Sequence, residues 1–244
     1  MSDVVFWHGW GMQPSVWNNV IALLDKMREG ESLLRAQPLP GYDGTAAPEP
    51  YTAEALVDAM LAELPGPVAL CGWSLGAMLA LLAAQRHPDK VKRLILIGAT
   101  PSFVRREGWP CAMETGMLAE FAAAVALDPQ TARRRFIALF NQNDSNARHI
   151  GRALAPAETP SAAVLDSGLA LLGEIDLRGI IQTIVQPTLL IHGEHDPLMP
   201  LAAAQWLAET MPHARLEVLS NAAHAPFISD PARCAALISE FLDE

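Results

Sequence analysis

The feature that most constrains this chain is the segment GWSLG at residues 72–76, which has the spacing G-x-S-x-G. An apolar run at 68–71 precedes it, as expected of a buried strand, and the apolar stretch 75–86 follows it, as expected of a buried helix. A strand that becomes a helix within so few residues strains the backbone at the serine, and the flanking glycines leave room for that turn. The segment therefore predicts a sharp elbow that presents Ser74 at a helix N-terminus.

Two further residues supply the partners of a serine nucleophile, because a hydroxyl reacts poorly near neutral pH unless a base takes its proton. His224 lies in the last loop, after the strand predicted at 216–219 and before the helix predicted at 230–242. Asp196 follows the preceding predicted strand, so the three occur in the order Ser…Asp…His. We predict Ser74 as the nucleophile, His224 as its base and Asp196 as the acid that orients the imidazole.

Each of these predictions has an alternative. The elbow could be an ordinary strand-to-helix turn that contains a serine, and the histidine could be a loop residue without a role. Glu194 competes with Asp196 as the acid, whereas Asp176 is better explained as a helix cap or hinge. The segment 192–196 offers several metal ligands close together, but a metal site there would leave the elbow serine unexplained. We predict no metal.

Attack of a serine on a carbonyl also needs donors for the negative charge that develops on oxygen. The backbone N–H after the nucleophile, that of Leu75, is one predicted donor. The sequence HGWG at residues 8–11 follows an early strand, and its glycines allow backbone N–H groups to turn inward. The Trp10 N–H is the predicted second donor, and His8 is predicted to hold the loop.

The order of the predicted elements indicates an α/β fold with an inserted helical cap. Apolar strands alternate with helices up to residue 101 and again from residue 177, which is typical of a mostly parallel sheet of about six strands flanked by helices. We predict a core of residues 1–101 and 177–244, with a cap at 102–176. The predicted strands are 4–7, 33–38, 68–71, 91–98, 188–192 and 216–219, and the predicted cap helices are 115–127, 129–141, 145–153 and 162–172.

Composition and charge limit the partners and the cellular location that we expect for the protein. The chain has 244 residues and a formal net charge of −10, which argues against a nucleic-acid partner because phosphates would be repelled. No apolar run approaches the roughly 18 residues of a membrane span, and the three cysteines show no paired spacing. We expect a cytoplasmic protein, without a membrane partner and without a signal peptide.

The chain resembles the pimeloyl-[acyl-carrier protein] methyl ester esterases of biotin synthesis, which are carboxylesterases of the α/β-hydrolase superfamily. The resemblance runs nearly from end to end and rests on HGWG at 8–11, GWSLG at 72–76, EGWP at 107–110, RFIAL at 135–139, IDLR at 175–178 and AHAPFIS at 223–229. Two departures stand out. Only five residues precede the core of the first strand, so the sheet edge is expected to be shorter, and the aspartate loop GEHD at 193–196 differs from the usual form.

The resemblance implies hydrolysis of the methyl ester of a carrier-bound pimeloyl chain by a monomeric enzyme that needs no cofactor. Acyl carrier proteins are acidic, and the cap segment 131–153 has five arginines against one acid, Asp144. A basic island of this kind would steer an acidic partner, although it could also be a solvated helix face with internal ion pairs. The arginines predicted to dock the carrier are Arg133, Arg134, Arg135, Arg148 and Arg152.

The acyl chain would need apolar walls beside the serine. Trp10, Trp73 and Phe136 are the predicted substrate contacts, and Phe103 and Trp109 are weaker candidates, since aromatic residues can equally pack the cap onto the core. Two other functions remain open on the sequence. The chain could be a broad carboxylesterase for small esters without a carrier partner, or a binding module that has kept the fold without catalysis.

Overall fold

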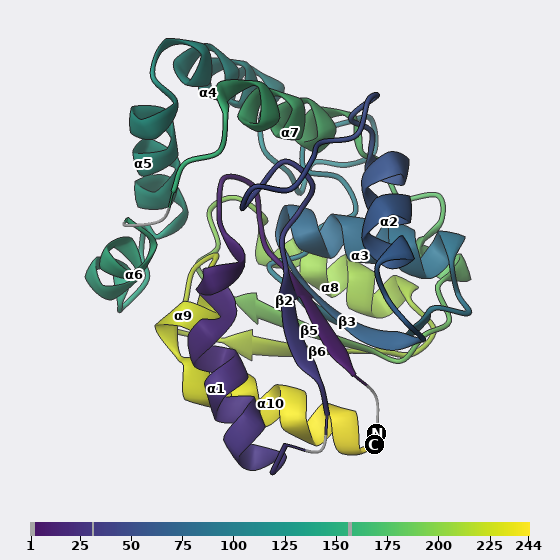
Figure 1. The fold of residues 1–244 in the computed structure, drawn as a ribbon. Helices are drawn as coiled ribbons and strands as arrows, with labels where there is room; N and C mark the ends of the chain where they lie inside the picture. Colours follow the sequence, from purple (N-terminus) through teal and green to yellow (C-terminus); the bar gives the residue numbers. More distant parts are fainter. Residues whose placement is uncertain (1–2, 31, 156–157) are drawn as a thin grey trace.

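A computed structural model describes residues 3–30, 32–155 and 158–244. Its centre is a six-stranded sheet in the order β2-β1-β3-β4-β5-β6, and every neighbouring pair is parallel (Figure 1). The strands are β1 (Val4–Trp7), β2 (Leu34–Gln37), β3 (Val68–Trp73), β4 (Val91–Ile97), β5 (Thr188–Gly193) and β6 (Ala214–Leu219). The predicted α/β fold with about six strands is confirmed.

Burial explains why the inner strands were readable as continuous apolar runs. All residues of β1, β3 and β5 are buried, because helices cover both faces of a parallel sheet. The edge strands β2 and β6 are only half-buried and carry charged residues such as Arg35 and Glu217. The prediction for β6 accordingly began two residues late, at 216.

Helices form a layer on each face of the sheet. One layer holds α1 (Asn18–Met27) and α10 (Pro231–Asp243), and the other holds α2 (Ala53–Ala62), α3 (Leu75–Arg86) and α8 (Leu201–Thr210) (Figure 1). Short helical turns occur at η1 (Pro14–Trp17), η2 (Ile181–Thr183) and α9 (Pro226–Ser229). None of the helices in the described ranges is long and apolar enough to cross a membrane.

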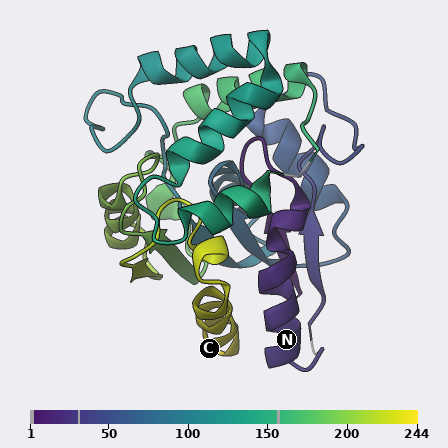
Figure 2. The ribbon, with the colours of Figure 1, turned by 90° about the vertical axis from the view of Figure 1, so that its left-hand side faces the viewer.

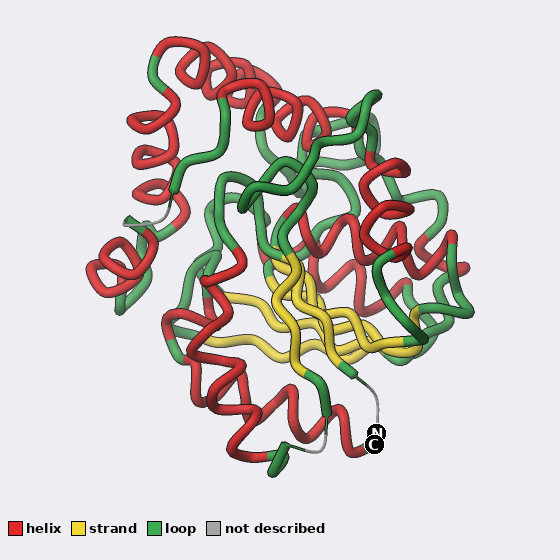
Figure 3. The backbone as a smooth tube through the Cα atoms, viewed as in Figure 1, coloured by secondary structure: helices red, strands yellow, loops and turns green. Residues whose placement is uncertain are grey.

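Four further helices lie together on one side of the sheet: α4 (Thr115–Leu127), α5 (Pro129–Phe140), α6 (Ala147–Leu154) and α7 (Ala162–Glu174). Figure 1 shows α4 and α7 above the core and α5 and α6 descending at its left-hand side, Figure 2 shows this side from the front, and in Figure 3 the strands lie below α4 and α7. Ser102 forms an antiparallel bridge with Asp176, and the Leu177 N–H donates to the Pro101 carbonyl. The insert therefore leaves and rejoins the core at adjacent points, which supports the boundaries 102–176 that we propose for the cap.

Candidate active site

The turn at Ser74 has the strained geometry that the sequence predicts. Ser74 has φ of +57° and ψ of −120° and stands immediately before α3. A Cβ atom at Gly72 would lie 2.4 Å from the Gly76 carbonyl oxygen, and one at Gly76 would lie 2.4 Å from the Trp7 carbonyl oxygen. Only glycine fits at either position, so this close packing forces the elbow and points the serine away from the sheet.

Asp196 and His224 form a buried hydrogen-bonded pair. His224 Nδ1 lies 2.7 Å from Asp196 Oδ2, and Asp196 Oδ1 accepts the Leu198 and Met199 N–H groups at 2.9 Å each. Burial by itself would raise the pKa of Asp196, but the charge of His224 and its hydrogen bond hold that pKa below its ordinary value. An ionised Asp196 accepts the Nδ1 proton, which leaves Nε2 of His224 free to accept one.

The imidazole lies beside the elbow. The His224 carbonyl accepts the indole N–H of Trp73 at 2.8 Å, and Trp73 directly precedes Ser74. A Cβ atom on Gly98 would lie 3.0 Å from His224 Nδ1, and the neighbouring Ile97 carbonyl accepts the Ser74 N–H at 3.0 Å. Among the described residues His224 Nε2 has no hydrogen-bond partner, although it is buried. The structure thus brings the serine, the histidine and the aspartate of the prediction into one site.

The HGWG loop at residues 8–11 packs against Ser74. A Cβ atom on Gly9 would lie 3.1 Å from the Ser74 Cβ. The indole N–H of Trp10 donates to the Leu165 carbonyl at 2.8 Å, but within the described part of the chain neither the backbone N–H of Trp10 nor that of Leu75 donates to a protein acceptor. Both groups are therefore available for a substrate oxygen, and we keep them as the proposed oxyanion donors.

His8 holds this loop in a defined tautomer. Its Nε2 accepts the Leu39 N–H at 3.1 Å, so Nδ1 carries the proton and donates to the Gly9 carbonyl at 2.9 Å. The ring is completely buried, and burial lowers the pKa of His8 to about 4. A protonated ring could not accept from Leu39, which explains why the neutral form is required. The predicted structural role of His8 is confirmed.

This burial gives an expected pH dependence of stability. The pKa of His8 is about 4 in the folded protein and about 6.5 in the unfolded chain, so unfolding takes up a proton between these values. The stabilisation is complete above pH 6.5 and is lost as the pH falls towards 4, by roughly 3 kcal/mol in the free energy of unfolding. The variant His8→Gln can still accept from Leu39 but cannot titrate. Urea unfolding from pH 8 to pH 4 should give a flatter curve for this variant, and parallel curves would contradict the assignment.

The alternative acids lie elsewhere. The Glu194 side chain is exposed, whereas Asp176 pairs with Arg178 at 2.7 Å. His192 is a neighbour of the site that the sequence analysis did not select. It lies 3.6 Å from Asp196 Oδ2 and donates through Nε2 to the Met199 carbonyl. No cluster of metal-binding side chains occurs in the part of the chain that the structure describes.

Aromatic side chains surround the site. Trp10 meets Phe136 edge to face with ring centroids 4.8 Å apart, and Phe140 lies 5.6 Å from the His224 ring. The sequence analysis named Trp10, Trp73 and Phe136 but missed Phe140, although its spacing of four residues from Phe136 puts both on one helix face. The weaker candidate Trp109 lies apart: it packs on Trp206 of α8 and donates to the Ser102 carbonyl.

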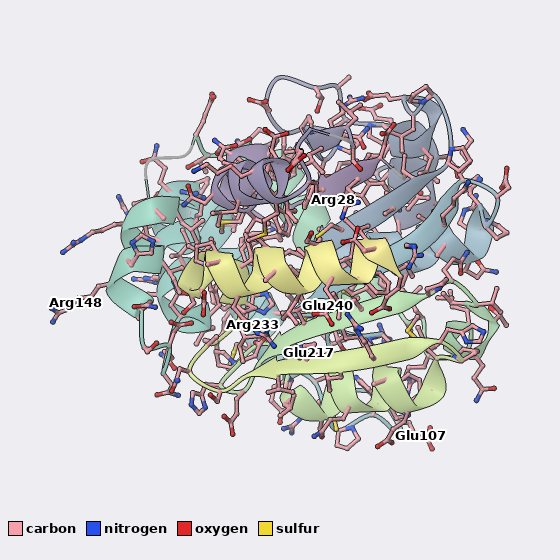
Figure 4. The ribbon with its side chains drawn as sticks, turned by 90° about the horizontal axis from the view of Figure 1, so that it is seen from below. Arg28, Glu107, Arg148, Glu217, Arg233 and Glu240 are labelled. Atoms are coloured by element: carbon pink, nitrogen blue, oxygen red, sulfur yellow. The ribbon has the colours of Figure 1, made fainter. Side chains whose placement is uncertain are left out.

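The five arginines of the cap do not form one surface. Arg133 is 2% exposed, and its guanidinium donates to the Gly11 and Leu154 carbonyls at 2.7 Å each. The prediction that Arg133 docks a carrier is therefore wrong, because the side chain lies inside the cap and fixes the HGWG loop. The other four are exposed, and Figure 4 shows Arg148 projecting outward from α6. They are Arg134, Arg135, Arg148 and Arg152.

A parallel sheet with a strained serine elbow, a histidine after the last strand and a helical insert defines the α/β-hydrolase class. The family model described as "Alpha/beta hydrolase family" matches residues 4–237. An esterase from Exiguobacterium antarcticum has a TM-score of 0.86 at 22% identity over 100% of this chain and 94% of its own, and an enol-lactonase from Burkholderia xenovorans LB400 has a TM-score of 0.83 at 21% identity, covering 100% and 92%.

Curated relatives narrow the assignment. A pimeloyl-[acyl-carrier protein] methyl ester esterase from Aromatoleum aromaticum is 44% identical over 98% of this chain and 97% of its own length. A protein of the same name from Nitrosomonas europaea is 34% identical over 94% and 91%, respectively. The chain belongs to the alpha/beta hydrolase family and, within it, to the family of pimeloyl-[acyl-carrier protein] methyl ester esterases.

Proposed function

We propose that this protein hydrolyses the methyl ester of pimeloyl-[acyl-carrier protein], releasing methanol and the free acid on its carrier, as a step of biotin synthesis. The observation that carries the proposal is the 44% identity, over almost the full length of both chains, to a relative of that name. The site geometry supports it independently, because an elbow serine beside a buried His–Asp pair is suited to acyl transfer.

The reaction proceeds in two halves. Ser74 Oγ attacks the ester carbonyl carbon while His224 Nε2 takes the hydroxyl proton, and the oxyanion accepts from the Leu75 and Trp10 N–H groups. The C–O bond to the methoxy group then breaks, and His224 returns the proton so that methanol leaves. Water attacks the acyl-enzyme with His224 again as base, the ester bond to Ser74 breaks, and the serine recovers its proton.

Apolar side chains would surround the acyl chain during this reaction. Trp10, Trp73 and Phe136 are the proposed contacts, and Phe140 joins them because its ring lies between Phe136 and His224. Their burial makes the region beside Ser74 poor in water, which strengthens the interactions of the oxyanion with its donors.

The surface of α5 and α6 is the proposed docking site for the carrier. Arg148 and Arg152 are exposed one turn apart on α6, and Arg134 and Arg135 are exposed on α5. A cavity of about 430 Å³ with mostly apolar walls lies between the two helices, and Arg134 and Arg148 contribute to its lining. A local positive charge on a protein of net charge −10 favours an acidic partner at this place.

Charge reversal separates the carrier substrate from a small ester. In the double variant Arg148→Glu and Arg152→Glu, we expect kcat/KM on the carrier-bound methyl ester to fall by about 10- to 100-fold, because steering becomes repulsion. Turnover of a nitrophenyl ester should stay within about twofold, since neither residue lies at Ser74. Raised salt should reduce only the carrier reaction, because exposed charges are screened over about 8–10 Å.

Lys92→Glu is the matched control, because it makes the same kind of change at an exposed position near the start of β4. It should leave both reactions unchanged. Equal losses on both substrates in the double variant would count against docking. Small-ester activity without any hydrolysis of the carrier-bound ester would favour a broad carboxylesterase. Failure of a fluorophosphonate to label Ser74 would favour a non-catalytic binding module.

A further inference from the structure

The loop that carries His224 has few hydrogen bonds of its own. Residues 220–225 connect β6 to α9 through turns and irregular backbone, although Ala223 and His224 are both completely buried. Buried N–H groups need acceptors, and outside regular structure these must come from other segments. Two of the acceptors belong to the cap: Asp144 Oδ2 takes the Ala223 N–H at 2.7 Å, and the Phe140 carbonyl takes the His224 N–H at 3.3 Å.

Asp144 joins three segments through one carboxylate. It lies between α5 and α6 and is 7% exposed. Besides the bond from Ala223, its Oδ1 accepts the Asn146 N–H at 2.7 Å and the Ser229 hydroxyl at 2.8 Å. Hydrogen bonds to an ionised carboxylate are shorter and stronger than those between neutral groups. One cap residue thus ties the start of α6 to the histidine loop and to α9.

Neighbouring contacts extend this connection to both sides of His224. The Ser145 N–H donates to the Asn221 carbonyl at 3.0 Å, before the histidine, and Asn146 Nδ2 donates to the Ser229 carbonyl at 2.9 Å, after it. Figures 1 and 2 place α6 next to α9, in agreement with the contacts between these two helices. Asn221, Ala223 and His224 of the loop are thus bonded to the cap, with Asp144 at the centre of these bonds, whereas the Ala222 carbonyl accepts the His195 N–H of the core at 3.0 Å.

We propose that Asp144 is a positioning residue for the base: it fixes the backbone of the loop from which the His224 imidazole reaches Ser74. Asp196 sets the orientation and tautomer of the ring, and Trp73 holds the His224 carbonyl, but neither fixes the preceding peptide. Catalytic groups must be held within about 0.5 Å of their working geometry, and displacements near 1 Å can cost about 100-fold in rate. If so, the cap holds the base in position in addition to covering the site. The inference rests on the role proposed for His224.

The test uses the full-length enzyme and a small nitrophenyl ester, so that it does not depend on the carrier. Asp144→Ala should lower kcat by about 10- to 100-fold with KM within about threefold, because Asp144 does not reach the substrate. Asp144→Asn should fall between this variant and the unsubstituted enzyme, since an amide oxygen can still accept one N–H. The limb of the pH–rate profile that reports the histidine should shift in both variants.

Asp128→Ala is the matched control. Asp128 is another cap aspartate. It accepts the Thr131 N–H at the start of α5, whereas the residue that bonds His224, Phe140, is at the other end of that helix. Its loss should lower the melting temperature and leave kcat unchanged. A merely structural Asp144 would behave in the same way, and a folded Asp144→Ala enzyme with unchanged kcat and pH profile would overturn the proposal.

A second readout does not need activity. The proton that His224 Nδ1 shares with Asp196 should give a far-downfield signal in the proton NMR spectrum, and this signal should move or broaden in Asp144→Asn but not in Asp128→Ala. If Asp144→Ala fails to fold, Ser229→Ala removes one donor from the same carboxylate and should give a smaller loss of kcat. An unaltered signal in Asp144→Asn would count against positioning even if the enzyme proved inactive on every ester.

Discussion

Replacement of Ser74 by alanine is expected to reduce kcat on any ester by a factor on the order of 10⁵–10⁶, because the attacking oxygen is lost while the surrounding site remains. The residual rate should still exceed that of water, since the proposed oxyanion donors are backbone groups that the substitution leaves in place. The substitution leaves the backbone hydrogen bonds of the turn in place, including that from the Ser74 N–H to the Ile97 carbonyl, so the melting temperature should change little. Burst kinetics and fluorophosphonate labelling should both disappear.

The control for this experiment is Ser239→Ala on α10, which removes a hydroxyl from the opposite end of the molecule. It should retain full activity and full labelling. A Ser74→Ala enzyme with more than about 1% of the original kcat would show that another nucleophile carries the reaction. Removing His224 in addition should cost little more, because residues that act as a unit lose their effect together.

Replacement of Asp196 by asparagine should lower kcat by about 10⁴-fold through the wrong tautomer of His224. Asp196 Oδ1 accepts two N–H groups, those of Leu198 and Met199, so the oxygen of an asparagine would stay on that side. Its NH₂ group would then face Nδ1 of the imidazole and donate to it. The ring would carry its proton on Nε2, where it cannot accept the proton of Ser74.

Glu194→Gln provides the comparison, because Glu194 is an acid of the same loop with an exposed side chain. We expect its kcat to stay within about twofold of the original. A large loss in Glu194→Gln together with a functional Asp196→Asn enzyme would reverse the assignment of the acid. We would measure kcat across pH 5–9 for both variants.

The elbow at Ser74 is a part of the site that sequence patterns were sufficient to predict. The elbow was predictable because its signal is local: two glycines, a strand before and a helix after are all within a few residues, and backbone strain permits few other residues there. The cap helices α4 and α5 were predicted to within one residue for the same reason, since their limits are set by local punctuation such as Pro129. The order of serine, aspartate and histidine then restricted the partners.

Arg133 shows where a pattern was present but was misinterpreted. The positions 133, 136, 137 and 140 share one face of α5, and all four are buried. Arg133 therefore belonged with the phenylalanines of that face and not with Arg134 and Arg135, which follow it directly and are exposed. The three arginines are adjacent in sequence, but the helix places Arg133 on its buried face and Arg134 and Arg135 on its exposed face.

The sequence alone determined the parallel α/β fold, the helical insert and the strained turn at Ser74, because each depends on residue periodicity or on a turn that few residues can form. The tertiary structure decided which side chains hold these parts together. The bond from Ala223 to Asp144 spans 79 positions, and the bond from the Arg133 guanidinium to the Gly11 carbonyl spans 122. No local pattern specifies such a pair, because its geometry exists only after the cap and the core have packed.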